Sequence, residues 1–271
     1  RLRSPLRAAS RASRMRSSPG SPPAGMAAHR TAANTAHTLF FNTLRFATLR
    51  PYASSRPAKM PPENSIVTPP APHSGNDSGQ EIAALRKSLR EARITAREAL
   101  PAAEREPRSR RIETHLDSLI AHLSPRRLAF CWPWRGEVDL VAWIGRWLAA
   151  DPARQAALPV VDAPGQAMRF LRWQPEAPME RDHHGIPIPA GAPPVIPEVV
   201  LIPLNVFDPA GYRLGYGGGY FDRTLAALRP APICVGVAFE LARADTVHPQ
   251  DHDQPMDWIV TEAGAARALS G

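Results

Sequence analysis

The chain has 271 residues and a formal net charge of +8 at pH 7, with 33 Lys and Arg side chains against 25 Asp and Glu. The basic excess lies in residues 1–80, which carry 11 basic and 2 acidic side chains, whereas residues 81–271 carry 22 and 23. Because the longer part is close to neutral, the composition argues against a basic nucleic-acid-binding surface, and we expect no nucleic-acid or membrane partner.

Residues 1–80 are rich in Arg, Ser, Ala and Pro and lack the apolar periodicity that a folded core requires, so we expect them to be disordered. Three origins fit this composition: an over-extended reading frame with the true start at Met26 or Met60, an organelle transit peptide, or a functional basic tail. The one apolar patch, at residues 38–49, is too short and too often interrupted by polar residues to span a membrane.

Two amphipathic helices are predicted after this segment. Residues 81–100 place apolar side chains at steps of three and four, with arginines on the remaining faces. Pro101 ends this helix, and a second is predicted over about residues 110–123, where a Ser-Pro pair stops it.

Short apolar runs then alternate with helical patterns. They predict strands at residues 128–132, 158–161, 168–173, 199–206, 233–239 and 258–261, and helices at 139–150 and around 224–228. Near-continuous apolar strands that alternate with helices are typical of a mostly parallel sheet. We therefore predict a single α/β domain over residues 81–271, a three-layer-like fold with a central, mostly parallel sheet flanked by helices.

Residues 207–223 form the most informative segment, because they place five glycines, two arginines and two aspartates directly after an apolar strand. Glycines allow positive φ and bring bare N–H groups against an anion. Arg213 adds a guanidinium fork, and Asp222 adds a hard oxygen for Mg²⁺. The pattern predicts a phosphate-binding loop at the carboxyl end of a strand, where ligands of such sheets bind.

Other polar and sulfur-containing residues carry weaker signals. Residues 174–197 contain seven prolines and predict a long surface loop, in which the adjacent His183 and His184 are expected to be solvated and not to share a metal. Cys131 and Cys234 lie in apolar runs and are expected to be buried free thiols, which suits a reducing compartment.

Four segments together resemble one family, the 5-formyltetrahydrofolate cyclo-ligases, also called 5,10-methenyltetrahydrofolate synthetases. They are the loop from Arg213 to Asp222 with the preceding strand, the run Arg86-Lys87-Ser88-Leu89-Arg90, the run Gly136-Glu137-Val138-Asp139, and residues 252–262. The resemblance covers about residues 81–264, and its Arg-Leu-Gly-Tyr-Gly-Gly-Gly-Tyr-Phe-Asp-Arg core is highly specific.

The resemblance implies a ligase that uses ATP and Mg²⁺ to convert 5-formyltetrahydrofolate to 5,10-methenyltetrahydrofolate, with release of ADP and phosphate. Phosphorylation of the formyl oxygen would make it a leaving group, and a neighbouring folate nitrogen would then close the ring. Such phosphoryl transfer depends mainly on positioning and on neutralising charge. The enzyme would be a cytoplasmic protein of one-carbon metabolism, or an organellar one if residues 1–59 are a transit peptide, and we expect a monomer.

Site residues carry over by matching motif positions. Arg213 and Tyr220 would be catalytic, and Asp222 and Asp253 would bind the metal. ATP would be bound by Arg86, Lys87, Ser88, Leu89, Arg90, Arg213, Leu214, Gly215, Tyr216, Gly217, Gly218, Gly219, Tyr220 and Phe221. The folate would be bound by Trp132, Glu137, Tyr216, Gly217, Gly218, Gly219 and Tyr220.

The residues alone leave other interpretations open. Asp253 also suits a turn, Arg86 and Arg90 also suit a solvated helix face, and Trp132 also suits the core. Arg86 stands where the family commonly has Lys, Ile188 where it often has Glu, and Glu198 where it often has Asp. Two other functions remain: an enzyme that handles phosphosugars or coenzyme A on a similar fold, and a nucleic-acid-binding protein that uses the basic tail.

Overall fold

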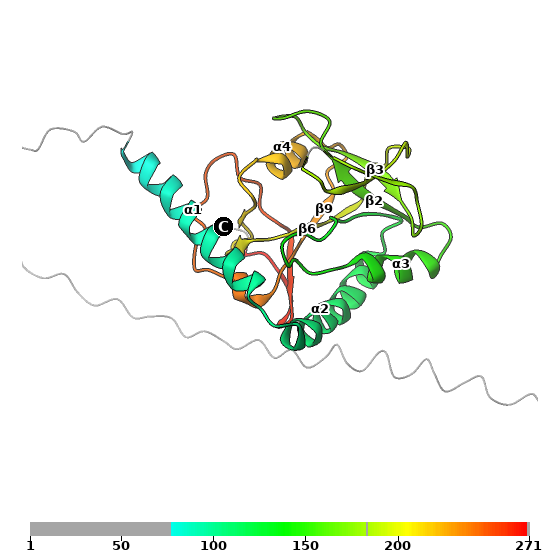
Figure 1. The fold of residues 1–271 in the computed structure, drawn as a ribbon, viewed down its shortest axis with the longest axis horizontal. Helices are drawn as coiled ribbons and strands as arrows, with labels where there is room; N and C mark the ends of the chain where they lie inside the picture. The colour runs from blue at the N-terminus through cyan, green and yellow to red at the C-terminus, as the bar shows by residue number, and fades with distance from the viewer. Residues whose placement is uncertain (1–76, 183, 270–271) are drawn as a thin grey trace, which may run out of the picture. The chain divides into compact units, whose positions relative to one another are not determined.

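The computed structural model describes residues 77–182 and 184–269, and their centre is one seven-stranded sheet (Figure 1). In chain order its strands are β1 (Arg127–Ala129), β2 (Gln155–Val160), β3 (Arg169–Trp173), β6 (Val199–Pro203), β9 (Ile233–Val237), β10 (Trp258–Thr261) and β11 (Gly264–Arg267). In space the order is β11-β10-β9-β6-β1-β2-β3. The five inner strands are parallel, and each edge strand is antiparallel to its neighbour. The predicted mostly parallel sheet is confirmed.

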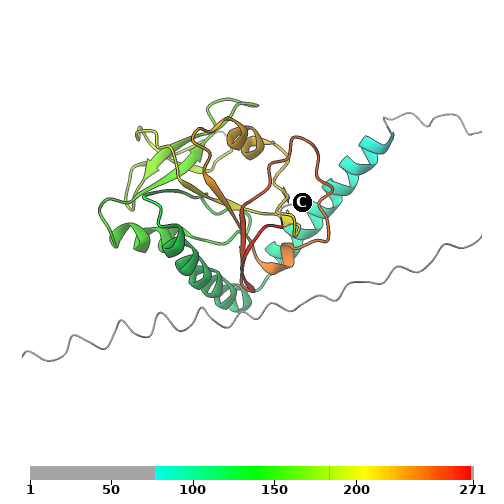
Figure 2. The same ribbon diagram turned by 180° about the vertical axis from the view of Figure 1, so that it is seen from behind.

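Helices cover both faces of the sheet, as the opposite views of Figures 1 and 2 show. The helices are α1 (Asp77–Glu98), α2 (Ala102–Leu123), α3 (Val141–Ala149), α4 (Tyr220–Ala227) and the short 3₁₀ helix η1 (Glu240–Ala242). Helices α2 and α3 pack on one face and α4 on the other, while α1 packs on η1 at the margin. The flanking helices of the predicted fold class are therefore present.

The two faces of the sheet belong to two separate cores. In β6, Val199 and Leu201 point to the core that α2 and α3 cover, whereas Val200 and Ile202 point to the core that α4 covers. Successive side chains of a strand point to opposite faces, so a strand buried on both sides must be apolar throughout. This explains why apolar and polar residues do not alternate along β6.

Several predicted boundaries are wrong. Helix α2 begins at Ala102, not near residue 110, and runs through Pro107. A proline this near the amino end costs one backbone hydrogen bond, which the packing of four buried apolar residues in α2 compensates. Strand β1 stops at Ala129, so the chain leaves the sheet earlier than the apolar run suggested.

The predicted surface loop at residues 174–197 contains a small hairpin of β4 (Met179–Arg181) and β5 (Pro187–Pro189). Asp182 closes its turn, because one carboxylate oxygen accepts from the N–H groups of His184 and Ile186. Aspartate is a common turn residue because its side chain can accept from backbone N–H groups that follow it. Proline is tolerated there because a two-stranded hairpin leaves one edge of each strand unpaired.

Both cysteines are free, as predicted; Cys234 is buried and Cys131 is half-buried. Burial raises the pKa of the Cys234 thiol to about 12, so this thiol stays protonated and unreactive at neutral pH. Within residues 77–182 and 184–269, no helix is long and apolar enough to span a membrane. The predicted disordered segment at residues 1–80 falls almost entirely outside the described residues.

Candidate active site

Most of the predicted site residues lie near the carboxyl edge of the sheet, where the chain departs from β1 in one direction and from β6 in the other. The segment after β1 carries Trp132 and Glu137. The segment after β6 enters a second small hairpin, β7 (Val206–Phe207) with β8 (Arg213–Leu214), and then the glycine loop. Divergence of neighbouring connections at such an edge opens the space in which parallel sheets bind ligands.

The glycine loop, residues 215–219, requires glycine at several points. Gly217 and Gly219 have φ values of 96° and 62°, which side chains strongly disfavour. At Gly218 a Cβ atom would lie only 2.7 Å from the ring of Tyr220. Gly219 is also the residue before α4, so the free N–H groups of that helix begin where the loop ends. The glycines of the loop therefore present backbone rather than side chains.

The guanidinium of Arg213 is buried and already hydrogen-bonded within the protein. Its side chain is 4% exposed, and its guanidinium donates to Asp222 Oδ1 at 2.9 Å and to the backbone carbonyl of Gln254. It also lies 5.9 Å from the centre of the Phe221 ring. In this arrangement Arg213 holds Asp222 in place.

The five predicted residues of α1 divide between two sides of the helix. Arg86, Leu89 and Arg90 face the body of the protein, whereas Lys87 and Ser88 are exposed. The guanidinium of Arg90 lies beside the glycine loop, 3.6 Å from where a Cβ atom of Gly217 would stand. Burial, and then the neighbouring charge of Arg86, lower the pKa of Arg90, and its buried Nε has no hydrogen-bond partner among the described residues.

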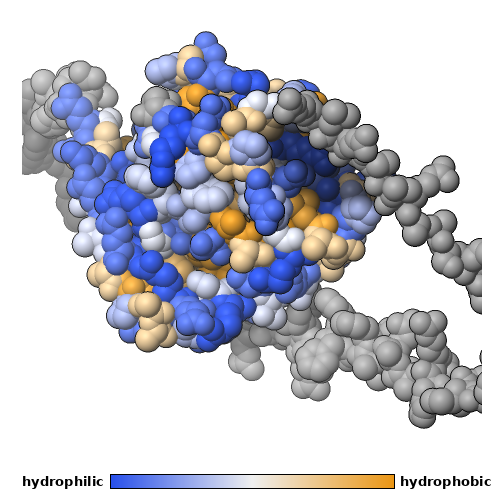
Figure 3. Space-filling model, turned by 45° about the vertical axis from the view of Figure 1, so that its right-hand side comes forward, coloured by the Kyte–Doolittle hydropathy of each residue, from blue (hydrophilic) through white to orange (hydrophobic). Residues whose placement is uncertain are grey.

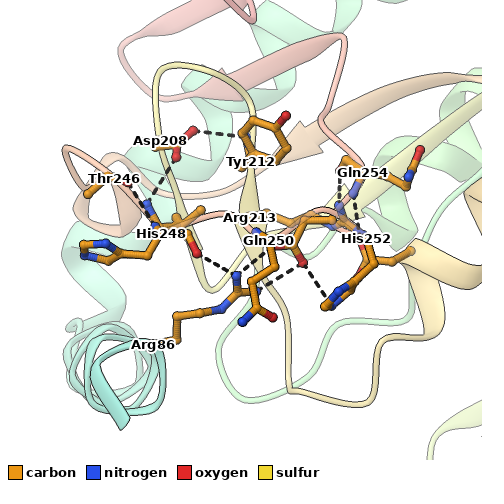
Figure 4. Close-up of polar contacts among 12 residues, drawn as sticks. Arg86, Asp208, Tyr212, Arg213, Thr246, His248, Gln250, His252 and Gln254 are labelled. Atoms are coloured by element: carbon orange, nitrogen blue, oxygen red, sulfur yellow. Dashed lines mark hydrogen bonds and ion pairs between the residues drawn. The ribbon is translucent and has the colours of Figure 1, made fainter. Parts of the chain in front are cut away.

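Asp253 forms a two-pronged ion pair with Arg86. Nη1 of Arg86 donates to Oδ2 at 2.6 Å, and Nη2 donates to Oδ1 at 3.1 Å. Figure 4 shows Arg86 reaching from its helix to the segment that carries His248, Gln250 and His252, and Nη1 also donates to the carbonyl of His248. The two residues predicted to bind ATP and metal thus bind each other.

Glu137 and Tyr216 are hydrogen-bonded to each other. Glu137 is 7% exposed and accepts from the Tyr216 hydroxyl at 2.8 Å and from the Trp134 N–H at 3.0 Å. Burial raises the pKa of Glu137, while the Tyr216 hydroxyl and the charge of Arg97 act to lower it. Trp132, five residues before Glu137 in the same segment, packs against the α2–α3 core. Two of the predicted folate-binding residues, Glu137 and Tyr216, are therefore in direct contact.

Tyr220 lies on the other side of the loop. It begins α4, and its ring packs under the Arg223 guanidinium at 5.2 Å and edge-on to His184 at 6.4 Å. The β4–β5 hairpin therefore approaches the glycine loop through His184. Within the described ranges, no group of three or more His, Cys, Asp and Glu side chains could by itself hold a metal ion.

Three buried polar residues at the site were not predicted. Arg97 on α1 contacts Asn205 and Tyr216. Asp208 accepts from the N–H of Val247 at 3.1 Å. It also accepts from the N–H of Tyr212 at 3.0 Å (Figure 4). The helical spacing of arginines at 86, 90, 93 and 97 is a signal that could have indicated Arg97.

The carboxyl-terminal strand closes over the turn before β8. Gly211 has a φ of 87°, and a Cβ atom there would lie 2.6 Å from the Cβ of Ala268 and 2.8 Å from the carbonyl oxygen of Met256. The N–H of Leu269 donates to the carbonyl of Pro209 at 3.0 Å. The last described residues therefore hold the turn that leads into Arg213.

Hydrophilic residues dominate the face of the protein that Figure 3 shows, and hydrophobic residues lie there in small separate groups. The face shown therefore lacks a large apolar patch of the kind that marks an extended contact with another protein.

The chain is similar to proteins of one family. A family model described as the 5-formyltetrahydrofolate cyclo-ligase family matches residues 80–262. The 5-formyltetrahydrofolate cyclo-ligase of Haemophilus influenzae is 27% identical over 180 residues, which are 64% of this chain and 92% of the relative. That of Mycolicibacterium smegmatis is 27% identical over 195 residues, 68% of this chain and 97% of the relative.

Two solved structures are similar in fold. The 5,10-methenyltetrahydrofolate synthetase of Aquifex aeolicus is 28% identical with a TM-score of 0.60, covering 69% of this chain and 94% of that one. The synthetase of Mycoplasma pneumoniae is 23% identical with a TM-score of 0.53, covering 65% and 98%. The second likeness concerns the fold alone.

Proposed function

The chain belongs to the 5-formyltetrahydrofolate cyclo-ligase family, and on that premise we propose that it converts 5-formyltetrahydrofolate to 5,10-methenyltetrahydrofolate at the expense of ATP. One observation carries the proposal for the site. Arg86 and Arg90 of α1, the glycine loop, and the carboxylate of Asp222 come together at the carboxyl edge of the sheet, from segments more than a hundred residues apart.

A triphosphate fits this arrangement. The loop offers bare backbone N–H groups and the amino end of α4, both of which attract anions. Arg90 stands beside the loop with an unpartnered buried Nε and a pKa depressed by burial and by Arg86, and a polyanion would relieve both. We assign the phosphates to this loop and to Arg86 and Arg90.

A magnesium ion fits Asp222 better than Asp253. Within the described residues, Asp222 accepts hydrogen bonds through Oδ1 only, which leaves Oδ2 for a cation, and its side chain is 20% exposed. Mg²⁺ commonly takes one or two carboxylates and completes its shell with water and phosphate oxygens. Both oxygens of Asp253 are held by Arg86, so metal binding by Asp253 would require that ion pair to separate.

ATP supplies the phosphoryl group that turns the formyl oxygen of the folate into a leaving group. The residues of this chain then have defined tasks. Arg213 orients Asp222, and Arg90 neutralises phosphate charge, which is the main catalytic requirement of phosphoryl transfer. Glu137 uses one lone pair on each oxygen for Tyr216 and Trp134, so each oxygen keeps a further lone pair for donors of the folate ring.

The near-ultraviolet absorbance of the methenyl product tests the proposal. The full chain is incubated with 5-formyltetrahydrofolate and Mg²⁺, with and without ATP. ATP-dependent growth of the product band supports the function, and a folded chain that gives no band refutes it. Arg213→Ala should abolish turnover while the far-ultraviolet circular dichroism stays unchanged; a near-normal rate would remove Arg213 from the site.

The protein that carries out this reaction is proposed to act as a monomer in the cytoplasm, with residues 81–271 as its catalytic domain. A small-molecule substrate requires no partner surface. None of the proposed steps uses the basic segment at residues 1–80.

A further inference from the structure

Arg97 lies in the last turn of α1 and is 3% exposed, a rare environment for a guanidinium. Its nitrogens have three different partners. Nε donates to the carbonyl of Arg135 at 3.1 Å, Nη1 donates to Asn205 Oδ1 at 2.8 Å, and Nη2 donates to the Tyr216 hydroxyl at 3.0 Å. The three contacts fix the plane of the guanidinium completely.

The hydroxyl of Tyr216 connects Arg97 to Glu137. Because arginine only donates, the hydroxyl accepts from Arg97 and must direct its own proton to Glu137 Oε1, at 2.8 Å. The guanidinium itself lies 4.0 Å from that oxygen. The order Arg97, Tyr216, Glu137 is therefore a chain of hydrogen bonds with one possible direction, and it orients the carboxylate.

Asn205 anchors the other side of the guanidinium. It lies between β6 and β7 and is 2% exposed. Its Oδ1 must face Arg97, which leaves its Nδ2 buried with no hydrogen-bond partner among the described residues. An unpaired buried donor lowers the stability of the folded protein. The orientation of Asn205 therefore costs stability, and the hydrogen bond that it accepts from Arg97 is its counterpart.

Arg97 thereby joins the two halves of the site. Tyr216 belongs to the glycine loop, and Glu137 belongs to the segment after β1 that lies at the folate side. We propose that Arg97 is a positioning residue, which holds the Glu137 carboxylate and the Tyr216 hydroxyl in register so that folate binding depends on one buried guanidinium. This inference rests on the proposed function and extends it to a residue that contacts neither substrate.

Electrostatics support the geometry. Burial raises the pKa of Glu137, and Tyr216, Arg97 and the Trp134 N–H oppose that shift. Without Arg97, the buried carboxyl would more readily take up a proton and lose an acceptor site for the folate ring.

Two variants test the role. Arg97→Lys keeps the charge but loses the three-way fork. Tyr216→Phe removes only the shared hydroxyl, and circular dichroism establishes that each variant is folded before its binding is measured. Isothermal titration with 5-formyltetrahydrofolate in the absence of ATP gives the dissociation constant directly, and steady-state rates give KM for each substrate. The matched control is Arg154→Lys, a half-buried arginine that donates to the carbonyl of Trp147, away from the site.

We expect each of the two variants to weaken folate binding by about 10-fold or more while KM for ATP changes by less than about 3-fold. The double variant should be no weaker than the worse single variant, because both break the same chain of hydrogen bonds. The Arg154→Lys control should match the wild type. If Arg97→Lys does not fold, Asn205→Ala decides, because it removes the acceptor of Arg97 Nη1 without removing the Tyr216 hydroxyl or the Glu137 carboxylate, and it should weaken folate binding in the same way.

The outcomes separate this inference from the proposed function. A wild-type chain that turns over, together with variants whose folate affinity is unchanged or whose KM rises equally for both substrates, overturns the positioning role and leaves the function intact. A wild-type chain that neither binds nor converts 5-formyltetrahydrofolate overturns both.

Discussion

Replacing Arg86 by Met should destabilise the protein even without any ligand. Asp253 has a side chain that is only 5% exposed, and Arg86 supplies both of its charged hydrogen bonds. Without them the carboxylate keeps the N–H of Gln250 at 2.8 Å and the exposed His252 at 3.8 Å. A buried charge would then lack its main partner.

The magnitude follows from this burial. Removing one partner of a buried ion pair costs roughly 3–5 kcal/mol. Arg86 is 13% exposed and Asp253 retains one backbone donor, so we expect the lower end, about 3 kcal/mol. For a domain of this size, about 2–4 °C of melting temperature is lost per kcal/mol, which gives a decrease of roughly 6–12 °C.

The effect should depend on pH. Burial acts to raise the pKa of Asp253, but the Arg86 guanidinium and the Gln250 N–H prevail and hold it below its ordinary 3.8. A depressed carboxyl pKa stabilises the fold above the unfolded value and loses that contribution as pH falls through the folded value. The gap between wild type and Arg86→Met should therefore be full at pH 7 and shrink below about pH 3.8.

Thermal and urea unfolding, followed by circular dichroism, measure this gap. Asp253→Asn completes a double-mutant cycle, in which the pair should show a coupling of at least about 2 kcal/mol. Lys87→Met is the matched control, because Lys87 is 71% exposed and lies 4.0 Å from Glu91, a pair worth less than about 0.5 kcal/mol. A coupling between Arg86 and Asp253 below about 0.5 kcal/mol would refute the reasoning.

Three further changes test other parts of the site. Gly218→Ala would set a Cβ atom 2.7 Å from the Tyr220 ring, so KM for ATP should rise about 10-fold or more at an unchanged melting temperature; unchanged kinetics would show that the loop need not keep this shape. Asp222→Asn should raise the Mg²⁺ concentration that gives half-maximal rate, and an unchanged Mg²⁺ dependence would place the metal elsewhere. Asp208→Ala leaves two backbone N–H groups without their acceptor and should cost about 2–4 kcal/mol in urea unfolding; a loss under about 1 kcal/mol would contradict the bracing role of Asp208.

The sheet could be predicted because its strands are buried on both faces and therefore read as unbroken apolar runs, as in β6. The hairpin at residues 179–189 could not, because its strands have only three residues each and β5 has prolines at two of its three positions. The start of α2 was missed because Pro107 reads as a helix stop, although the helix tolerates it near its amino end.

Sequence motifs predicted which residues gather at the site but not how they pair. Arg86 and Asp253 are 167 positions apart, and their ion pair depends on how two distant segments pack. Arg213 was expected to face phosphate, yet its fork is directed at Asp222 and Gln254. Residue type and spacing carry no information about such side-chain directions, and the roles of these residues in ligand binding stay predictions.

The contact of Gly211 with Ala268 makes the end of the chain part of the site's support. The matched family segment ends at residue 262, so Ala268 and β11 (Gly264–Arg267) lie beyond it. A protein shortened to the matched segment would keep all the proposed ligand-binding residues and lose the strand that closes over the turn before Arg213. Truncating or tagging this end would therefore disturb the turn at Gly211 that leads into Arg213. A loss of activity caused in this way could be misread as the loss of an active-site residue.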